Sequence, residues 1–122
     1  MGKIPTKMKQ RVIVVPKDKV AQELLDRDEA TDQQLLELYL SNEEFYFLYK
    51  KGIFELINQI TGSLIDDFEN DSVLEKEKIL KIIESLNAQR VMFTNEWLVI
   101  IQKIVNLFEE ALKRGTGVHF YF

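Results

Sequence analysis

The sequence predicts a mostly α (α+β) single domain. About five helices are expected, with a small β element that pairs an N-terminal strand (about 11–15) with a C-terminal strand (about 118–122). Both segments are rich in β-branched or aromatic residues, and each lies beside proline or glycine. Between them, apolar residues recur every three or four positions, as on one face of a helix. A lone short strand is marginal in water, so the simplest partner of each terminal strand is the other.

Helix-capping signals stand before each run of periodic apolar residues. Asp18 follows Pro16 at the head of the first expected helix, which ends near Asp28. A capping box, serine or threonine followed three residues later by glutamate or glutamine, precedes most of the others. These four helices are expected to begin at Thr31, Ser41, Ser72 and Thr94.

The apolar stripes agree with these starting points. Residues 35–39 are assigned to the second helix, directly after its capping box. The third helix is the longest, with a stripe from Phe45 to Phe68, and Gly62 is expected to kink or split it, because glycine costs about 1 kcal/mol in a helix interior. The fifth helix is expected to end at Gly115, which suits a left-handed cap.

Length and composition indicate one soluble domain. The chain has 122 residues and no cysteine, so disulfides, thiolate zinc sites and a cysteine nucleophile are excluded. The apolar run that starts at Val12 is too short for a signal peptide, and no stretch is long and apolar enough to span a bilayer. We therefore expect a cytoplasmic protein with no membrane contact, made of a flexible basic arm (1–10) and a globular helical domain (11–122).

The single histidine gives little support for catalysis. His119 lies in the C-terminal strand, where alternation places it with Tyr121 on one face and Val118, Phe120 and Phe122 on the other. We expect the face of His119 to be the wetter one, and the histidine to be solvated rather than catalytic.

The acidic residues do not form a recognisable metal or acid–base motif. An EF-hand loop beginning at Asp67 would have Ser72 where glycine is needed and Lys78 where glutamate is needed. The Glu43-Glu44 pair is adjacent in the chain, so its members point to different sides of a helix. We therefore predict no enzyme activity, no catalytic residue, no metal site and no cofactor.

Charge is unevenly distributed along the chain. Residues 1–19 carry a net charge of +5 and residues 20–75 carry −11, within a total of −4. This asymmetry would steer a cationic partner to the body or an anionic partner to the arm. Solubility alone also accounts for acidic helices and a lysine-rich start, and that alternative stays open.

Residues 45–49 are five large apolar or amphipathic side chains in succession. They cover more than one helical turn, so a single core face cannot hold them all. Either this helix is packed on several sides, which is the commoner case, or one flank is an exposed binding surface. Aromatic residues in an acidic surround suit protein recognition. The candidate partner-binding residues are Glu37, Tyr39, Glu43, Glu44, Tyr46 and Tyr49.

Three stretches resemble the YfbM-like family of uncharacterised bacterial proteins. Residues 106–121 (NLFEEALKRGTGVHFY) look like that family's final helix, glycine break and closing strand. Residues 11–16 and 20–25 are similar to its opening strand and first helix. Residues 54–62 (FELINQITG) resemble its central helix, although the family's usual tryptophan is missing and Phe54 stands nearby. The resemblance implies a bacterial α+β protein with paired termini, and it implies no activity, because the family has no established one.

Two functions are compatible with these observations. The first is a small acidic interaction or inhibitory (immunity-like) module without catalytic activity, whose partner is another protein with a basic surface. The alternative is a nucleic-acid-associated regulatory protein that uses the basic arm, with Lys3, Lys7, Lys9 and Arg11 as phosphate contacts. The sequence pI near 5.1 makes nucleic acid the less favoured partner. A homodimer is possible, because the terminal strands can pair within one chain or between two.

Overall fold

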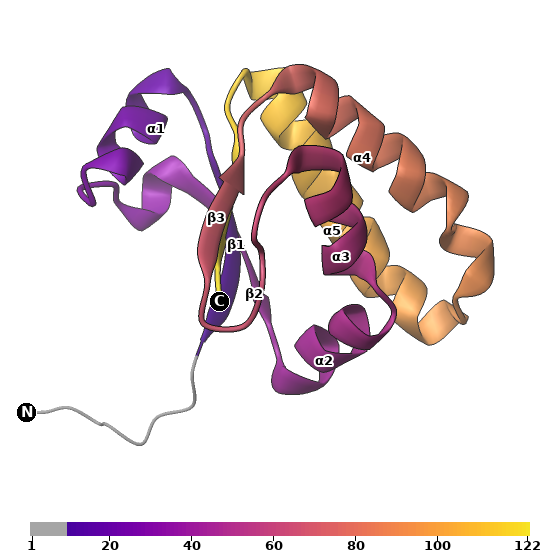
Figure 1. Cartoon of the computed structure of the whole chain (residues 1–122). Coiled ribbons are helices and arrows are strands. Elements are labelled where there is room, and N and C mark those ends of the chain that lie inside the picture. The colour runs from indigo at the N-terminus through magenta and orange to yellow at the C-terminus, as the bar shows by residue number, and fades with distance from the viewer. Residues whose placement is uncertain (1–9) are drawn as a thin grey trace, which may run out of the picture.

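Within residues 10–122, which this computed structural model describes, four antiparallel strands form one sheet (Figure 1). The strands are β1 (Arg11–Pro16), β2 (Leu35–Leu40), β3 (Asn70–Val73) and β4 (Val118–Tyr121), arranged in the order β2-β1-β4-β3. The predicted pairing of the two terminal strands is confirmed, and it occurs within one chain. Val12 lies opposite Tyr121, and Val14 lies opposite His119.

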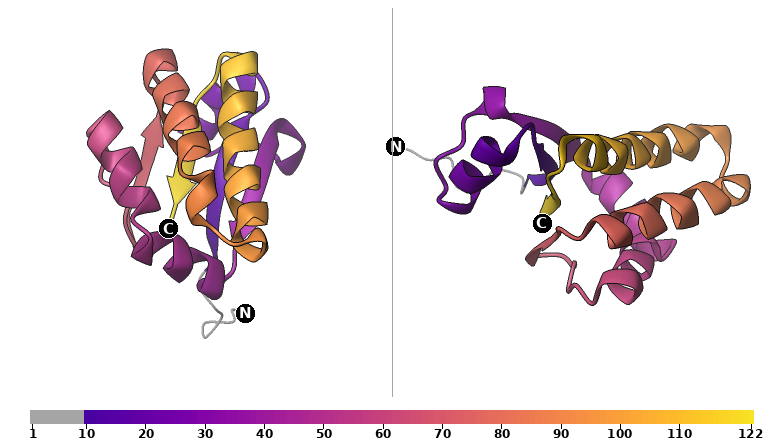
Figure 2. Two further views of the ribbon diagram at one scale, coloured as in Figure 1. Left: turned by 90° about the vertical axis from the view of Figure 1, so that its right-hand side faces the viewer. Right: turned by 90° about the horizontal axis from the view of Figure 1, so that it is seen from above.

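Five α-helices in the same part of the chain surround the sheet. They are α1 (Lys19–Asp26), α2 (Asn42–Lys50), α3 (Ile53–Thr61), α4 (Lys76–Ala88) and α5 (Asn95–Arg114). Figures 1 and 2 show α2 to α5 on one face of the sheet and α1 on the other. The predicted fold class, a mostly helical α+β domain with paired terminal strands, is confirmed. The predicted arm (1–10) lies outside the described residues except for Gln10.

The main core lies between the sheet and helices α2 to α5. Alternate residues of the inner strands point into it, among them Ile13, Val15, Val118 and Phe120. The largest helical contribution comes from the apolar stripe of α5, for example Ile104. The alternation predicted for the C-terminal strand is therefore confirmed for the residues that face the core.

The second predicted helix is wrong, since residues 35–39 belong to the edge strand β2. The capping box at Thr31 and Gln34 is present, but it caps a single 3-10 turn. Beyond it the sequence alternates, with Leu36 and Leu38 packed against the core and Glu37 on the opposite face. Pairing with β1 satisfies the backbone of this segment and prevails over its weak helical signal.

The long third helix is two helices. The capping box at Ser41 is confirmed, because its Oγ accepts the Glu44 N–H and the Glu44 carboxylate accepts the Ser41 N–H. Gly52 then adopts a left-handed conformation (φ +77°) and separates α2 from α3. Gly62, also at φ +77°, ends α3 instead of kinking a longer helix, so residues 63–69 form a loop.

The fourth helix begins later than predicted. Residues 70–73, which contain the predicted cap Ser72, form the edge strand β3 against β4, and α4 begins at Lys76 with Glu75 as its cap. The fifth helix begins after Thr94 and ends at Gly115 (φ +70°), as the sequence predicts.

Candidate functional site

The predicted partner-binding residues lie on separate surfaces. Glu37 and Tyr39 lie on β2 opposite Val14 and Val12, and therefore on the α1 side of the sheet. The other four residues lie on α2, on the far side. Glu43 and Glu44 occupy its first turn, where Glu44 serves the helix cap, and Tyr46 and Tyr49 share a different flank of the helix.

The helix that carries residues 45–49 uses both modes that the sequence left open. Phe45 and Leu48 are buried in the core. Phe47 is half-buried and stacks on Trp97 of α5, with ring centroids 3.9 Å apart. Tyr46 and Tyr49 are each 48% exposed. One flank of α2 therefore belongs to the core, and the flank that bears the two tyrosines is open to a partner.

Arg11 fixes this open flank to the rest of the molecule. Its side chain is buried (4% exposed), with the guanidinium carbon 4.2 Å from the centre of the Phe45 ring. The Nε and Nη2 atoms donate to the two carboxylate oxygens of Asp67 at 3.2 and 3.3 Å. The Nη1 atom donates to Asn42, and Nη2 also lies 3.5 Å from the Tyr46 hydroxyl oxygen. The start of β1, helix α2 and the 63–69 loop are thereby held together.

The buried position of Arg11 corrects one part of the sequence interpretation. The sequence places Arg11 among the phosphate contacts of a basic arm, but its guanidinium is engaged with Asp67 and stacked on Phe45. The reason is that β1 begins at this residue, so its side chain enters the core side of the sheet. The other candidate phosphate contacts, Lys3, Lys7 and Lys9, lie outside the described residues.

The loop that Arg11 holds presents an aromatic side chain beside the tyrosines. Phe68 is 77% exposed and has a left-handed backbone (φ +64°), which is uncommon for a bulky residue. It lies in a tight turn that is closed by the Glu69 N–H donating to the Asp66 carbonyl at 3.1 Å. Backbone strain of this kind concentrates at functional sites. We call the surface formed here the acidic–aromatic patch, and it consists of Tyr46, Tyr49, Glu55, Asp66, Asp67 and Phe68.

The negative charge of the patch acts on its tyrosines. The pKa of Tyr49 is raised chiefly by the charge of Asp66 and by a hydrogen bond to that carboxylate, with smaller contributions from burial, Asp67 and Glu55. Tyr49 therefore stays protonated and holds its hydroxyl against Asp66. Sequence reasoning identified the two tyrosines but assigned Asp66 to Phe68 to a turn. The signal that could have found them is an aromatic residue between acids, at Asp66-Asp67-Phe68-Glu69.

The expectation that His119 is solvated is wrong. It does lie on the face opposite the core, as alternation predicts, but it is only 6% exposed. Helix α1 covers that face, and the Gln22 side chain of α1 accepts the neighbouring Gly117 N–H at 2.8 Å. The Nε2 atom of His119 is buried and has no hydrogen-bond partner within the described part of the chain. Burial lowers the pKa of His119 below 6.5, and the charge of Asp26 raises it to a smaller extent.

This environment predicts acid sensitivity. Because the folded state disfavours protonated His119, the unfolded state takes up the proton first as the pH falls below 6.5. The contribution of His119 to stability is thus full above that pH and is lost as the pH falls toward its lower folded pKa. We expect the free energy of unfolding, measured with urea between about pH 7 and pH 5, to fall less steeply for His119→Leu than for the unmodified protein. Parallel pH profiles would contradict this assignment.

Residues 10–122 contain no group of three or more acidic or histidine side chains placed to hold a metal ion together. The carboxylates of the acidic turn are engaged in local structure, since Asp71 accepts the Leu64 N–H at 2.7 Å and Asp66 accepts the Asp67 N–H at 2.7 Å. In this described part of the chain, no helix combines the length and hydrophobicity needed to cross a membrane.

Comparison with known proteins gives a partial similarity. No family model and no solved structure matches the chain, so the resemblance to the YfbM-like family stays a prediction. Over 81 residues the chain is 32% identical to one of the subunits of succinyl-CoA:3-ketoacid coenzyme A transferase, in the form found in two strains of Helicobacter pylori. The match covers 62% of this chain and 35% of the transferase polypeptide, so it spans about a third of the length of these curated relatives.

Proposed function

We propose that this protein is a non-catalytic binding module, and that the acidic–aromatic patch covers a basic surface on another protein. An inhibitory, immunity-like role is the form of this function that we favour. The observation that carries the proposal is that Tyr46, Tyr49 and Phe68 are exposed together among carboxylates. The match to the transferase covers too little of that polypeptide to support a transferase activity.

The chemistry of the patch suits recognition of a protein. Tyrosine and other aromatic residues dominate the binding energy of protein interfaces, while acidic residues around them steer a basic partner and accelerate association. The patch is also held in place before binding, since Arg11 ties the loop of Asp67 to α2. Such preorganisation lowers the entropy lost when the partner binds.

The proposal is tested by capture from a lysate of the organism that makes the protein, at low and high salt, followed by mass spectrometry. The bait proteins are the unmodified chain, Tyr49→Ala with Phe68→Ala, and Tyr39→Ala. Tyr39 is the matched control, because it is a tyrosine of similar exposure (51%) on the other face of the sheet. Circular dichroism of each bait confirms that it is folded.

We expect a basic protein to be recovered with the unmodified bait and with Tyr39→Ala, and to be released at high salt. Its purified form should bind the patch variant about tenfold or more weakly, since truncation of interface aromatics commonly costs about 2 kcal/mol or more. Glu55→Lys should slow association, whereas Glu84→Lys on exposed α4 should not. Equal loss with Tyr39→Ala, or recovery of nucleic acid instead of protein, would contradict the proposal.

A further inference from the structure

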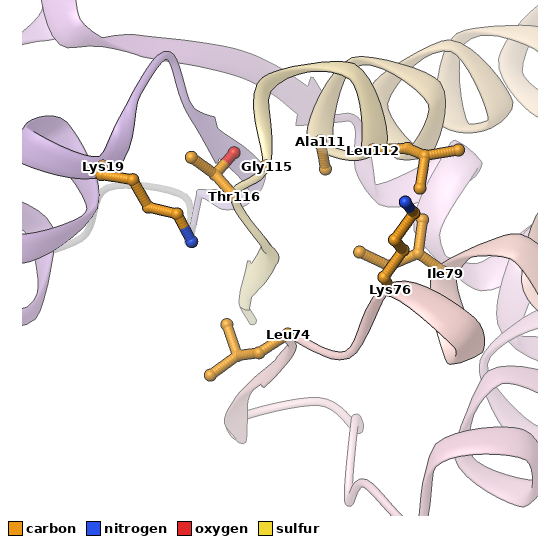
Figure 3. A pocket seen from close by; sticks show the side chains of 8 residues that line it. All are labelled: Lys19, Leu74, Lys76, Ile79, Ala111, Leu112, Gly115 and Thr116. Atoms are coloured by element: carbon orange, nitrogen blue, oxygen red, sulfur yellow. The ribbon is translucent and has the colours of Figure 1, made fainter.

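A pocket lies at the end of the sheet opposite the acidic–aromatic patch (Figure 3). Strand β3 connects the two places, because it begins at Asn70, next to the patch loop, and ends at Val73, next to Leu74 of the pocket. The pocket has a volume of about 250 Å³, and it is formed by the first residues of α1 and α4, the end of α5 and the residue after β3. Its position makes it independent of the proposed protein-binding surface.

The floor of the pocket is apolar. Ile79 of α4 and Ala111 of α5 are fully buried beneath it, and Leu112 and Leu74 line its sides. Thr116 adds no available hydroxyl proton, because its Oγ1 donates to the Pro16 carbonyl at 2.8 Å. A ligand on this floor therefore gains chiefly from burying apolar surface.

Lysines from two different helices border this apolar floor. Figure 3 shows Lys19, the first residue of α1, on one side of the pocket and Lys76, the first residue of α4, on the other. Among the described residues neither ammonium group has a hydrogen-bond or ion-pair partner. By contrast Lys78, two positions later in α4, pairs with Glu75 at 2.8 Å and donates to the Thr61 carbonyl.

These lysines are not needed to neutralise the end of α5. The last turn of that helix already carries Lys113 and Arg114, and Arg114 pairs with Glu110 at 2.9 Å. A pair of uncompensated cations beside an apolar floor, in a chain of net charge −4, is instead complementary to an amphipathic anion.

We propose that this pocket binds a small organic carboxylate with an apolar body. The carboxylate lies between the ammonium groups of Lys19 and Lys76, and the apolar part lies on Ile79 and Ala111. The volume of 250 Å³ corresponds to about eight water-sized groups at about 30 Å³ each, which sets the size of the ligand. A six-carbon monocarboxylate has this size.

The test uses hexanoate as the probe, titrated into the full-length ¹⁵N-labelled protein and followed by amide NMR shifts. Hexanol keeps the apolar body without the charge, and inorganic phosphate keeps the charge without the apolar body. The variants are Lys19→Gln and Lys76→Gln, and Lys103→Gln on the exposed surface of α5 is the matched control. All three lysines are exposed, so these variants are expected to fold.

We expect saturable shifts at the amides of Gly115, Thr116 and Ile79 with hexanoate, and weaker binding of hexanol and phosphate. Each pocket lysine variant should weaken hexanoate binding by about tenfold, since a hydrogen bond to a charged group is worth about 1.5 kcal/mol or more. Lys103→Gln should not change it. Three results would overturn the proposal: no saturable shift with hexanoate, equal binding of phosphate or hexanol, or equal effects of all three lysine variants.

Discussion

Replacing Phe120 by alanine is expected to lower the free energy of unfolding by about 3–5 kcal/mol. Phe120 is fully buried on the inner strand β4, opposite Ile13 of β1 and Asp71 of β3. Its ring lies 5.7 Å from that of Phe122 and 6.2 Å from that of Phe108 on α5, so the truncation leaves a cavity where the sheet meets the helices. Urea denaturation followed by circular dichroism measures the loss.

The neighbouring residue provides the control for this experiment. Tyr121 is half-buried and lies on the opposite face of β4, so Tyr121→Ala should cost clearly less than Phe120→Ala. A change within about 0.5 kcal/mol for Phe120→Ala is typical of exposed positions and would contradict the central place of β4 in the core.

The second large effect is expected for Arg11→Met. The substitution keeps an apolar stem over Phe45 but removes the guanidinium, so Asp67 loses its charge-assisted hydrogen bonds from Arg11, and Asn42 loses its donor. Breaking a buried ion pair from one side costs about 3–5 kcal/mol, and the 22% exposure of the Asp67 side chain reduces this to about 2–3 kcal/mol. The measurement is again the free energy of unfolding in urea.

Two comparisons identify the source of that loss. Arg27→Met removes an exposed arginine that pairs with the exposed Glu29 at 3.7 Å, and it should change stability by about 0.5 kcal/mol or less. Arg11→Lys keeps the charge but not the two-pronged geometry, so it should recover part of the loss. If Arg11→Met costs no more than Arg27→Met, the buried cluster does not stabilise the fold.

The sequence predicts most accurately those elements whose signals are local. The fifth helix is correct at both ends, because its apolar stripe, its basic last turn and Gly115 agree with one another. β1 and β4 are also predicted, because β-branched and aromatic runs beside proline and glycine leave few alternatives. The edge strand β2 is missed because the capping box at Thr31 is real, yet it ends after a single 3-10 turn, and the strand depends on a distant partner.

The candidate site could be predicted only in part for the same reason. The run at 45–49 identifies Tyr46 and Tyr49, which the structure places on an exposed flank. The adjoining loop could not be found this way, since Arg11 and Asp67 are separated by 56 positions. The burial of His119 has a similar origin, because it depends on where α1 packs, and strand alternation does not specify that.

The inner position of β1 and β4 has a consequence for how the chain acquires its structure during synthesis. β1 leaves the ribosome early and β2 soon follows, whereas the contact between Pro16 and Thr116 joins residues 100 positions apart. Until β4 is available, the second edge of β1 has no partner in the sheet and is open to pairing with other chains. Closing so long a loop slows folding far more than it lowers stability. We therefore expect the nascent protein to remain incompletely folded until residues 118–122 have emerged, and to depend in that interval on whatever keeps an exposed strand edge from aggregating.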